Sequence, residues 1–194
     1  MNVPLRCGCG AIQGYVEALP SGGRAVCYCR DGQAFARFLG RHDDILDSHG
    51  GTDIIASLPR SVHFTSGADK MACMSLSPRG LLRWYASCCR TPIGNTPRDR
   101  KLSYLGLVRN CLPETDAAFG PVKIELNTGS ARGKVEPTPL ATFFGIVKIM
   151  KNVFGARLSG KYRENPFFES DSGAPIKAPQ ILTLAERKAL DGGA

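Results

Sequence analysis

Hydrophobic and polar residues alternate along the first half of the chain, in short segments separated by turn-forming residues. Residues 11–19 place Ile12 and Val16 on one face and Gln13 and Glu17 on the other, which predicts a strand. Residues 20–23 then predict a turn. Further strand-like segments, at the spacing of β-hairpins, lie at 24–29, 53–58, 62–65, 70–76, 81–86 and 104–108. We therefore expect a mainly β, antiparallel structure in this half.

Two segments of this half break the alternation. Residues 33–39 fit either a strand or a short helix, and Phe35 and Phe38, three positions apart, slightly favour a helical turn. Residues 42–51 are rich in Asp, His and Gly, so we expect a loop there.

A different periodicity begins at Thr138 and Pro139, where a capping hydroxyl precedes a proline at the first helical position. Apolar residues then recur at helical spacing, at Leu140, Phe143, Phe144, Ile146, Val147, Ile149, Met150, Val153 and Phe154. So broad an apolar face favours a helix docked on the sheet. Two alternatives stay open: a helix at a membrane surface, formed by residues 139–163, and a contact between two copies of the chain through 139–158.

The end of the chain predicts little regular structure. Residues 165–180 contain three prolines and should be extended, and residues 183–186 form a capping box that opens a short terminal helix. We therefore expect a domain formed by residues 1–112 and a C-terminal extension, residues 113–194, with one long and one short helix packed on that domain.

Net charge and the distribution of apolar residues indicate which binding partners and which cell compartment to expect. The 194 residues carry a formal net charge of +8, but the basic residues are scattered and not interleaved with aromatic ones, which argues against a nucleic-acid partner. No segment reaches the roughly 18 apolar residues of a transmembrane helix. The first residues also lack the order of a secretory signal, a basic region followed by an apolar run. We expect a cytoplasmic protein whose cysteines remain thiols.

The candidate chemistry lies in the cysteines. Most of the eight fall into three close groups, Cys7-Gly8-Cys9, Cys27-Tyr28-Cys29 and Cys88-Cys89. Two cysteines one residue apart are poorly placed to form a disulfide with each other, whereas thiolates suit Zn²⁺, which takes four sulfur or nitrogen ligands in a tetrahedron. Cys7 and Cys9 predict one half of a zinc site. Cys88 and Cys89, at the end of a strand, predict the other half.

The second half of the zinc site depends on the local course of the backbone. Adjacent residues of a regular strand point to opposite faces, so Cys88 and Cys89 can bind one ion only if the backbone turns between the strand and Thr91. The alternative is that Cys88 is a buried thiol and Cys89 alone is a ligand. Cys27 and Cys29 indicate a second, incomplete metal site, because a catalytic zinc needs three protein ligands; two ordinary strand cysteines are the alternative.

Three segments carry a family resemblance. Residues 6–10 read Arg-Cys-Gly-Cys-Gly, residues 27–35 read Cys-Tyr-Cys-Arg-Asp-Gly-Gln-Ala-Phe, and residues 88–95 read Cys-Cys-Arg-Thr-Pro-Ile-Gly-Asn. In order and spacing they resemble the motifs of the glutathione-dependent formaldehyde-activating enzymes, which are Cys-x-Cys-Gly, Cys-His-Cys-x-x-Cys and Cys-x-x-Cys-Gly-Thr. The resemblance covers about residues 5–110 and implies a β-tent, a small antiparallel zinc-binding β fold.

The resemblance also implies a distribution of metal ligands. The first and last motifs of that family share a structural zinc, which implies the ligands Cys7, Cys9, Cys88 and Cys89 here. The chain departs from the last motif at Ala86, where the family has its first cysteine, so Cys88 stands in as a substitute ligand.

The middle motif of that family holds a second zinc, linked to glutathione adduct chemistry. This chain has Gly32 at the position of the third cysteine, so the second site carries over only as Cys27 and Cys29.

Two hypotheses for function follow. In the first, the protein is a carbon–sulfur lyase that acts on a glutathione conjugate, which predicts a second zinc with an open ligand position. In the second, it is a non-catalytic binding module stapled by one zinc, whose C-terminal helix and basic surface bind a partner.

Overall fold

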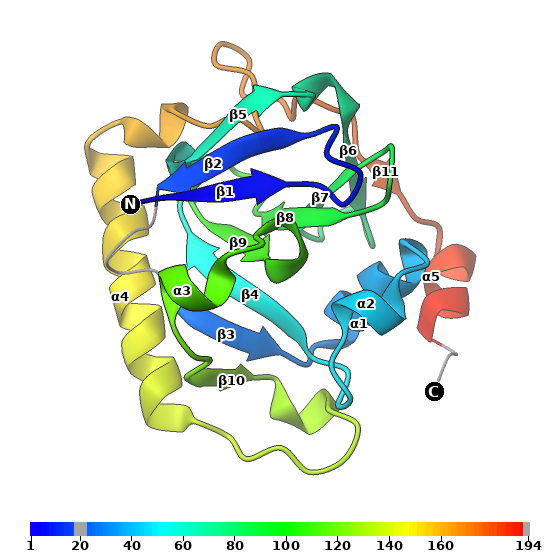
Figure 1. Cartoon of the computed structure of the whole chain (residues 1–194). Helices are drawn as coiled ribbons and strands as arrows, with labels where there is room; N and C mark the ends of the chain where they lie inside the picture. The colour runs from blue at the N-terminus through cyan, green and yellow to red at the C-terminus, as the bar shows by residue number, and fades with distance from the viewer. Residues whose placement is uncertain (18–22, 192–194) are drawn as a thin grey trace.

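The computed structural model of the chain describes residues 1–17 and 23–191 (Figure 1). The turn predicted at 20–23, apart from Gly23, and the end of the strand predicted at 11–19 lie outside these residues. Within the described ranges the strands form two sheets, ordered β1-β2-β5 and β10-β3-β4-β9-β8-β7-β6-β11. The strands are β1 (Asn2–Arg6), β2 (Gln13–Glu17), β3 (Arg24–Cys27), β4 (Thr52–Ser57), β5 (Val62–Ser66), β6 (Met71–Ser75), β7 (Leu82–Ala86), β8 (Pro92–Thr96), β9 (Leu105–Val108), β10 (Ile124–Leu126) and β11 (Gln180–Ile181).

The larger sheet is antiparallel through its centre and parallel at both edges. β10 pairs in parallel with β3, and β11 pairs in parallel with β6. Both edge strands come from the second half of the chain, so residues beyond 112 extend the sheet formed by the first half (Figure 1).

The predicted alternation is confirmed by strands β2 to β7 and β9, and the chain is mainly β with a C-terminal helical extension. Strands β1 and β8 were not predicted. β1 contains Pro4, which usually interrupts a strand, but its alternate residues Val3 and Leu5 are buried. β8 begins at Pro92, so close to the cysteine pair that the pattern there indicates only a turn.

The helices are α1 (Arg30–Phe38), α2 (His42–Ile45), α3 (Thr115–Phe119), α4 (Pro139–Leu158) and α5 (Leu184–Asp191), with 3₁₀ turns η1 (Pro59–Ser61), η2 (Ala68–Lys70), η3 (Arg109–Cys111), η4 (Thr128–Ser130) and η5 (Lys161–Arg163). The loop predicted at 42–51 is wrong over α2, where Asp43 and Asp44 occupy the first turn and favour the helix N-terminus. The capping box is confirmed, since the Glu186 carboxylate accepts the N–H of Thr183 at 2.7 Å.

The core between the sheets is completed by the C-terminal segment. Trp84 on β7 and Phe167 are both fully buried, and their ring centroids lie 5.2 Å apart. Phe64 on β5 contacts Phe167 edge-on at 5.8 Å. The segment predicted to be extended therefore contributes two aromatic residues, Phe167 and Phe168, to the main core.

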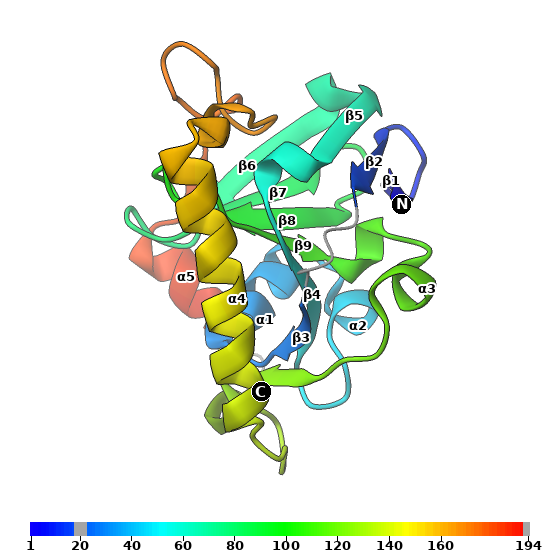
Figure 2. The ribbon, with the colours of Figure 1, turned by 90° about the vertical axis from the view of Figure 1, so that its left-hand side faces the viewer.

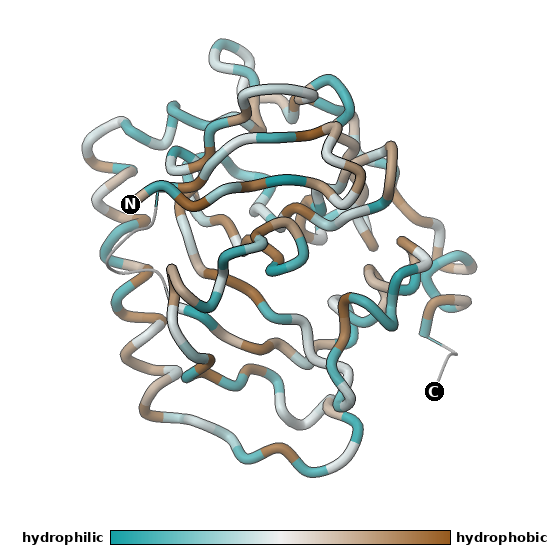
Figure 3. Tube along the Cα trace, viewed as in Figure 1, coloured by the Kyte–Doolittle hydropathy of each residue, from teal (hydrophilic) through white to brown (hydrophobic). Residues whose placement is uncertain are grey.

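Helix α4 contacts β10 and lies in front of the larger sheet, over β3 and β4 (Figure 2). The expected burial of its broad apolar face is not found. Phe144 is 66% exposed, and only Val153 and Ala156 of the helix are buried. The physical reason is the size of the support, because β10 has only three residues and a cavity separates the helix from β3 and β4. Hydrophobic residues recur along α4 (Figure 3), and Leu140, Phe143 and Phe144 are among the exposed ones.

No helix within residues 1–17 and 23–191 combines the length and hydrophobicity that crossing a bilayer requires.

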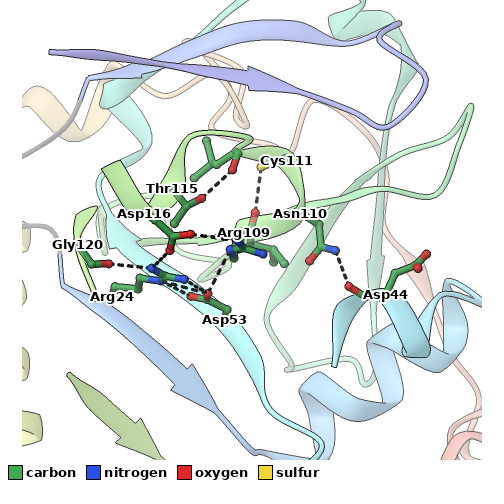
Figure 4. Close-up of polar contacts among 11 residues, drawn as sticks. Arg24, Asp44, Asp53, Arg109, Asn110, Cys111, Thr115, Asp116 and Gly120 are labelled. Atoms are coloured by element: carbon green, nitrogen blue, oxygen red, sulfur yellow. Dashed lines mark hydrogen bonds and ion pairs between the residues drawn. The ribbon is translucent and has the colours of Figure 1, made fainter. Parts of the chain in front are cut away.

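A cluster of charged residues fixes the chain after β9 to the sheet (Figure 4). The Arg24 guanidinium on β3 donates to Asp53 on β4 at 2.6 Å and also pairs with Asp116 on α3. Arg109 lies 3.6 Å from the same Asp53 carboxylate. The Arg24 hydrogen bond lowers the pKa of Asp116 and keeps it ionised. These contacts hold η3 and α3 against β3 and β4.

Candidate functional site

The first cysteine pair lies in a tight turn after β1. Cys7 N–H donates to the carbonyl of Ile12 at 3.0 Å, and Gly10 N–H donates to the carbonyl of Cys7 at 2.9 Å. Gly10 has a φ of 75°, in the region that favours glycine. The N–H of Ile12 also points at Cys7 Sγ, at 3.2 Å. The turn brings both sulfur atoms to one side and places a backbone donor on one of them.

The second pair lies in the turn between β7 and β8. Arg90 follows the pair with a φ of 54°, and its N–H donates to the carbonyl of Ala86 at 2.8 Å. The strand thus ends at Ala86, and the backbone turns at Cys88 and Cys89 as a shared site requires.

The structure brings the four sulfur atoms together. Cys9 Sγ lies 3.6 Å from Cys7 Sγ and 3.3 Å from Cys88 Sγ. Cys88 Sγ lies 4.0 Å from Cys7 Sγ and 3.9 Å from Cys89 Sγ. All four atoms are within 4.8 Å of one another. A tetrahedron of thiolates around zinc at about 2.3 Å has edges of about 3.8 Å. The donor set and its size therefore fit a metal ion.

Thr91 and Arg41 form hydrogen bonds beside this cluster. The buried Thr91 hydroxyl accepts the Gly8 N–H at 2.9 Å and an Arg41 N–H at 3.0 Å, and it lies 3.1 Å from Cys89 Sγ. Burial opposes ionisation of Cys89, but hydrogen bonds from Thr91 and from backbone N–H groups outweigh it and lower its pKa to about 6. A thiolate at this position is ready for a cation.

The middle pair, Cys27 and Cys29, lies apart from the four-cysteine cluster. Cys27 ends β3, and its Sγ accepts a hydrogen bond from the side-chain amide of Asn127 at 3.3 Å. Cys29 caps α1, and its Sγ accepts the N–H of Gly32 at 3.3 Å. A Cβ on Gly32 would lie 3.4 Å from Cys29 Sγ, so position 32 does face the pair. Among the described residues no third Cys, His, Asp or Glu completes a metal-binding group with these two.

The two middle thiols differ in acidity. The hydrogen bond from Cys29 is the main reason that the pKa of Cys27 falls, to about 6, and Asn127 and the charge of Arg83 assist against the opposing effect of burial. The pKa of Cys29 rises, because its proton is held by Cys27 and the site is buried. At neutral pH the pair consists of one thiolate and one thiol.

These thiols line a cavity of about 260 Å³ beneath α1. Arg83 on β7 also lines it, and it is the one basic side chain among the described lining residues. Arg83 is only 4% exposed; it donates to Asn95 Oδ1 at 3.2 Å, lies 3.7 Å from Asp31 and stands over the Phe35 ring at 5.4 Å. The cavity thus combines a thiolate with a buried guanidinium inside largely apolar walls.

A family model matches residues 1–178, and its description reads "family of unknown function (DUF6151)". The chain belongs to this family. No curated protein matches the chain. The DUF6151 match extends from β1 past α4 and Phe167, so it covers both cysteine centres of this chain and most of its C-terminal extension.

The sequence patterns missed the polar residues of the cavity. Arg83 lies in the predicted strand 81–86, where an arginine between apolar residues was a signal of a buried charge. Thr52, Tyr104 and Asn127 also line the cavity, but no motif includes them. They meet the thiols only because β4, β9 and β10 lie next to or near β3.

Proposed function

We propose that the four-cysteine cluster of this DUF6151 protein binds one Zn²⁺ ion with a structural role. Four thiolates form a closed ligand set, which is typical of structural rather than catalytic zinc. The ion would join the turn after β1 to the β7–β8 turn, in addition to the hydrogen bond from Gly8 to Thr91. The sulfur–sulfur distances carry this proposal.

Metal analysis of the purified protein tests it. We expect one zinc per chain, and loss of that zinc in Cys9→Ser and in Cys88→Ser. Cys73→Ala is the matched control, since Cys73 is a buried cysteine on β6 outside the cluster. Zinc retained at full stoichiometry by Cys9→Ser would contradict the assignment.

We further propose that the cavity of Cys27 and Cys29 is the active site, and that its reaction is the cleavage or formation of a carbon–sulfur bond in a thiol–aldehyde adduct. The observation that carries this is the Cys27 thiolate within the same cavity as Arg83. The lyase class comes from the family resemblance; the second zinc expected with it is not part of this proposal, because among the described residues no third ligand stands beside Cys27 and Cys29.

Cleavage of such an adduct needs a base and a stabilised leaving group. The Cys27 thiolate takes the proton of the adduct hydroxyl, the oxygen forms the carbonyl double bond, and the carbon–sulfur bond breaks. The departing thiolate lies near the Arg83 guanidinium, which stabilises its charge. Protons and charge balance, because Cys27 becomes a thiol as the substrate sulfur becomes a thiolate.

Aldehyde release from S-hydroxymethylglutathione measures this activity directly. We expect release above the spontaneous rate, a roughly hundredfold or greater loss in Cys27→Ser through loss of the base, and full activity in Cys73→Ala. A rate for the wild type equal to the spontaneous rate would sink the lyase proposal.

A wild-type rate equal to the spontaneous rate would favour a second candidate function, that of a non-catalytic binding module stabilised by zinc. Gly32 supports it, because the cavity then offers two thiols and no third ligand for a catalytic metal. In that case the cavity would bind small molecules without turning them over.

A further inference from the structure

A second cavity, of about 240 Å³, lies between α4 and the larger sheet. Its walls are almost wholly apolar, and no charged side chain lines it among the described residues. From the sheet they include Ala25, Ala56 and Ile124, and from the helix Ile146 and Ile149. An apolar hollow of this kind favours hydrocarbon over water.

The two cavities lie on one face of the same sheet. Residues two apart on a strand face the same side, so Ala25 lies on the face of Cys27, and Ile124 on the face of Leu126. In the pairing of β3 with β4, Ala25 lies opposite Ile54 and Cys27 lies opposite Thr52, so β4 contributes one residue to each cavity beside its partner on β3.

Three residues, Ile54, Tyr104 and Leu126, line both cavities, so the two spaces meet at these side chains. We call the two adjoining cavities, with these three side chains between them, the trough; the thiols lie at one end and the inner face of α4 at the other. Their combined size falls within the range of about 300–1,000 Å³ that is usual for small-molecule sites.

Most polar groups lie at the thiol end; the other end has Thr142, whose hydroxyl lies 3.4 Å from that of Thr138. The Thr52 hydroxyl is buried at the thiol end, in a residue only 7% exposed, and it has no hydrogen-bond partner within the described structure. The Tyr104 side chain lies at the junction of the cavities. The charges of the Cys27 thiolate and Arg83 offset each other, so a neutral head group fits better than an ionised one.

We propose that the trough binds an aliphatic aldehyde, free or as its thiol adduct, with the carbonyl carbon at Cys27 and the hydrocarbon tail beneath α4. The Thr52 hydroxyl donates a hydrogen bond to the oxygen, Arg83 is left to face the sulfur of the adduct, and the apolar cavity accommodates the chain. This assignment of a substrate class rests on the proposed function for the head group, whereas the tail site rests on the apolar cavity alone.

Non-reactive alcohols test the tail site without turnover. By calorimetry we expect octan-1-ol to bind the wild type roughly tenfold or more tightly than butan-1-ol, because each additional methylene leaves water. Ala56→Leu, which fills the apolar cavity, should remove most of this preference and leave butan-1-ol binding unchanged. Val147→Leu is the matched control, since Val147 is an exposed residue of α4 that does not line the cavity.

Protection of Cys27 tests the head group. We expect octanal to slow alkylation of Cys27 by iodoacetamide at lower concentration than butanal does, with the effect lost in Ala56→Leu. Equal binding of the two alcohols by the wild type, or a chain-length preference that Ala56→Leu does not change, would overturn the inference. Both outcomes are separate from the lyase assay, whose failure with a normal chain-length preference would remove the reaction and leave the tail site standing.

Discussion

Cys27 illustrates how a single side chain acquires its chemistry from its neighbours. The sequence places it two residues from Cys29, but Asn127 and Arg83 come from distant parts of the chain. Cys89 likewise depends on Thr91, which is two residues away, and on backbone groups of the facing turn. The residues that set the pKa of each thiol are thus partly its neighbours in sequence and partly its neighbours only in the folded structure.

The acidity of Cys27 predicts a pH profile for its alkylation. The thiolate is the reactive form and its pKa is about 6, so the rate should rise with pH through about 6 and level off near neutrality. An unperturbed cysteine has its midpoint near 8.5. Peptide mass spectrometry after timed alkylation measures the rate at Cys27 alone.

Cys29→Ala provides the comparison for that profile. It removes the main hydrogen bond that favours the thiolate, so the midpoint should move upward. An unchanged midpoint would show that Cys29 does not set the acidity of Cys27.

The zinc ligands predict a second effect at this scale. Cys9→Ser should lower the melting temperature as well as the zinc content, because the turn after β1 loses its link to the β7–β8 turn. Added chelator should lower the melting temperature of the wild type and leave that of Cys9→Ser unchanged. A chelator effect of equal size on both proteins would contradict this explanation.

At the scale of elements, α4 shows that helical periodicity can predict a helix without predicting which of its sides is buried. Its helical spacing predicted the element well, and the helix spans Pro139–Leu158. The side that faces the protein was not readable, because apolar residues surround most of the helix and polar ones form only a narrow strip. The short strand β10 decided which side is covered.

Two substitutions in α4 test this arrangement. Val153→Ala should destabilise the fold by roughly 1–2 kcal/mol, since Val153 is only 4% exposed. Phe144→Ala should change stability by less than about 0.5 kcal/mol, because the ring is already in water. Urea unfolding measures both values, and a larger cost for Phe144→Ala would mean that its ring is covered in solution.

On the scale of the whole molecule, the C-terminal extension is part of the main core. Phe167 contacts Trp84 and Phe64, and β10 and β11 form the two edges of the larger sheet. Segments far apart in the sequence therefore contribute to one core, and a fold built this way should unfold as one unit.

Phe167→Ala should accordingly destabilise the entire chain, by roughly 3–5 kcal/mol, because it leaves a cavity beside Trp84. Unfolding followed by tryptophan fluorescence and by circular dichroism should show one transition at the same denaturant concentration. Two separate transitions would indicate that residues 1–112 fold independently of the extension.

The sequence by itself determined most strands of the first half, though not β1 and β8, together with the long helix and the four cysteines that come together. These features depend on local periodicity and on residue types with few roles. It also indicated that the second cysteine pair lacks a third ligand. Only the tertiary structure decided that Arg83, Thr52 and Tyr104 meet Cys27, and that an apolar cavity continues beneath α4. Those features depend on which strands lie side by side, and strand order is set by the packing of the whole sheet rather than by any one segment.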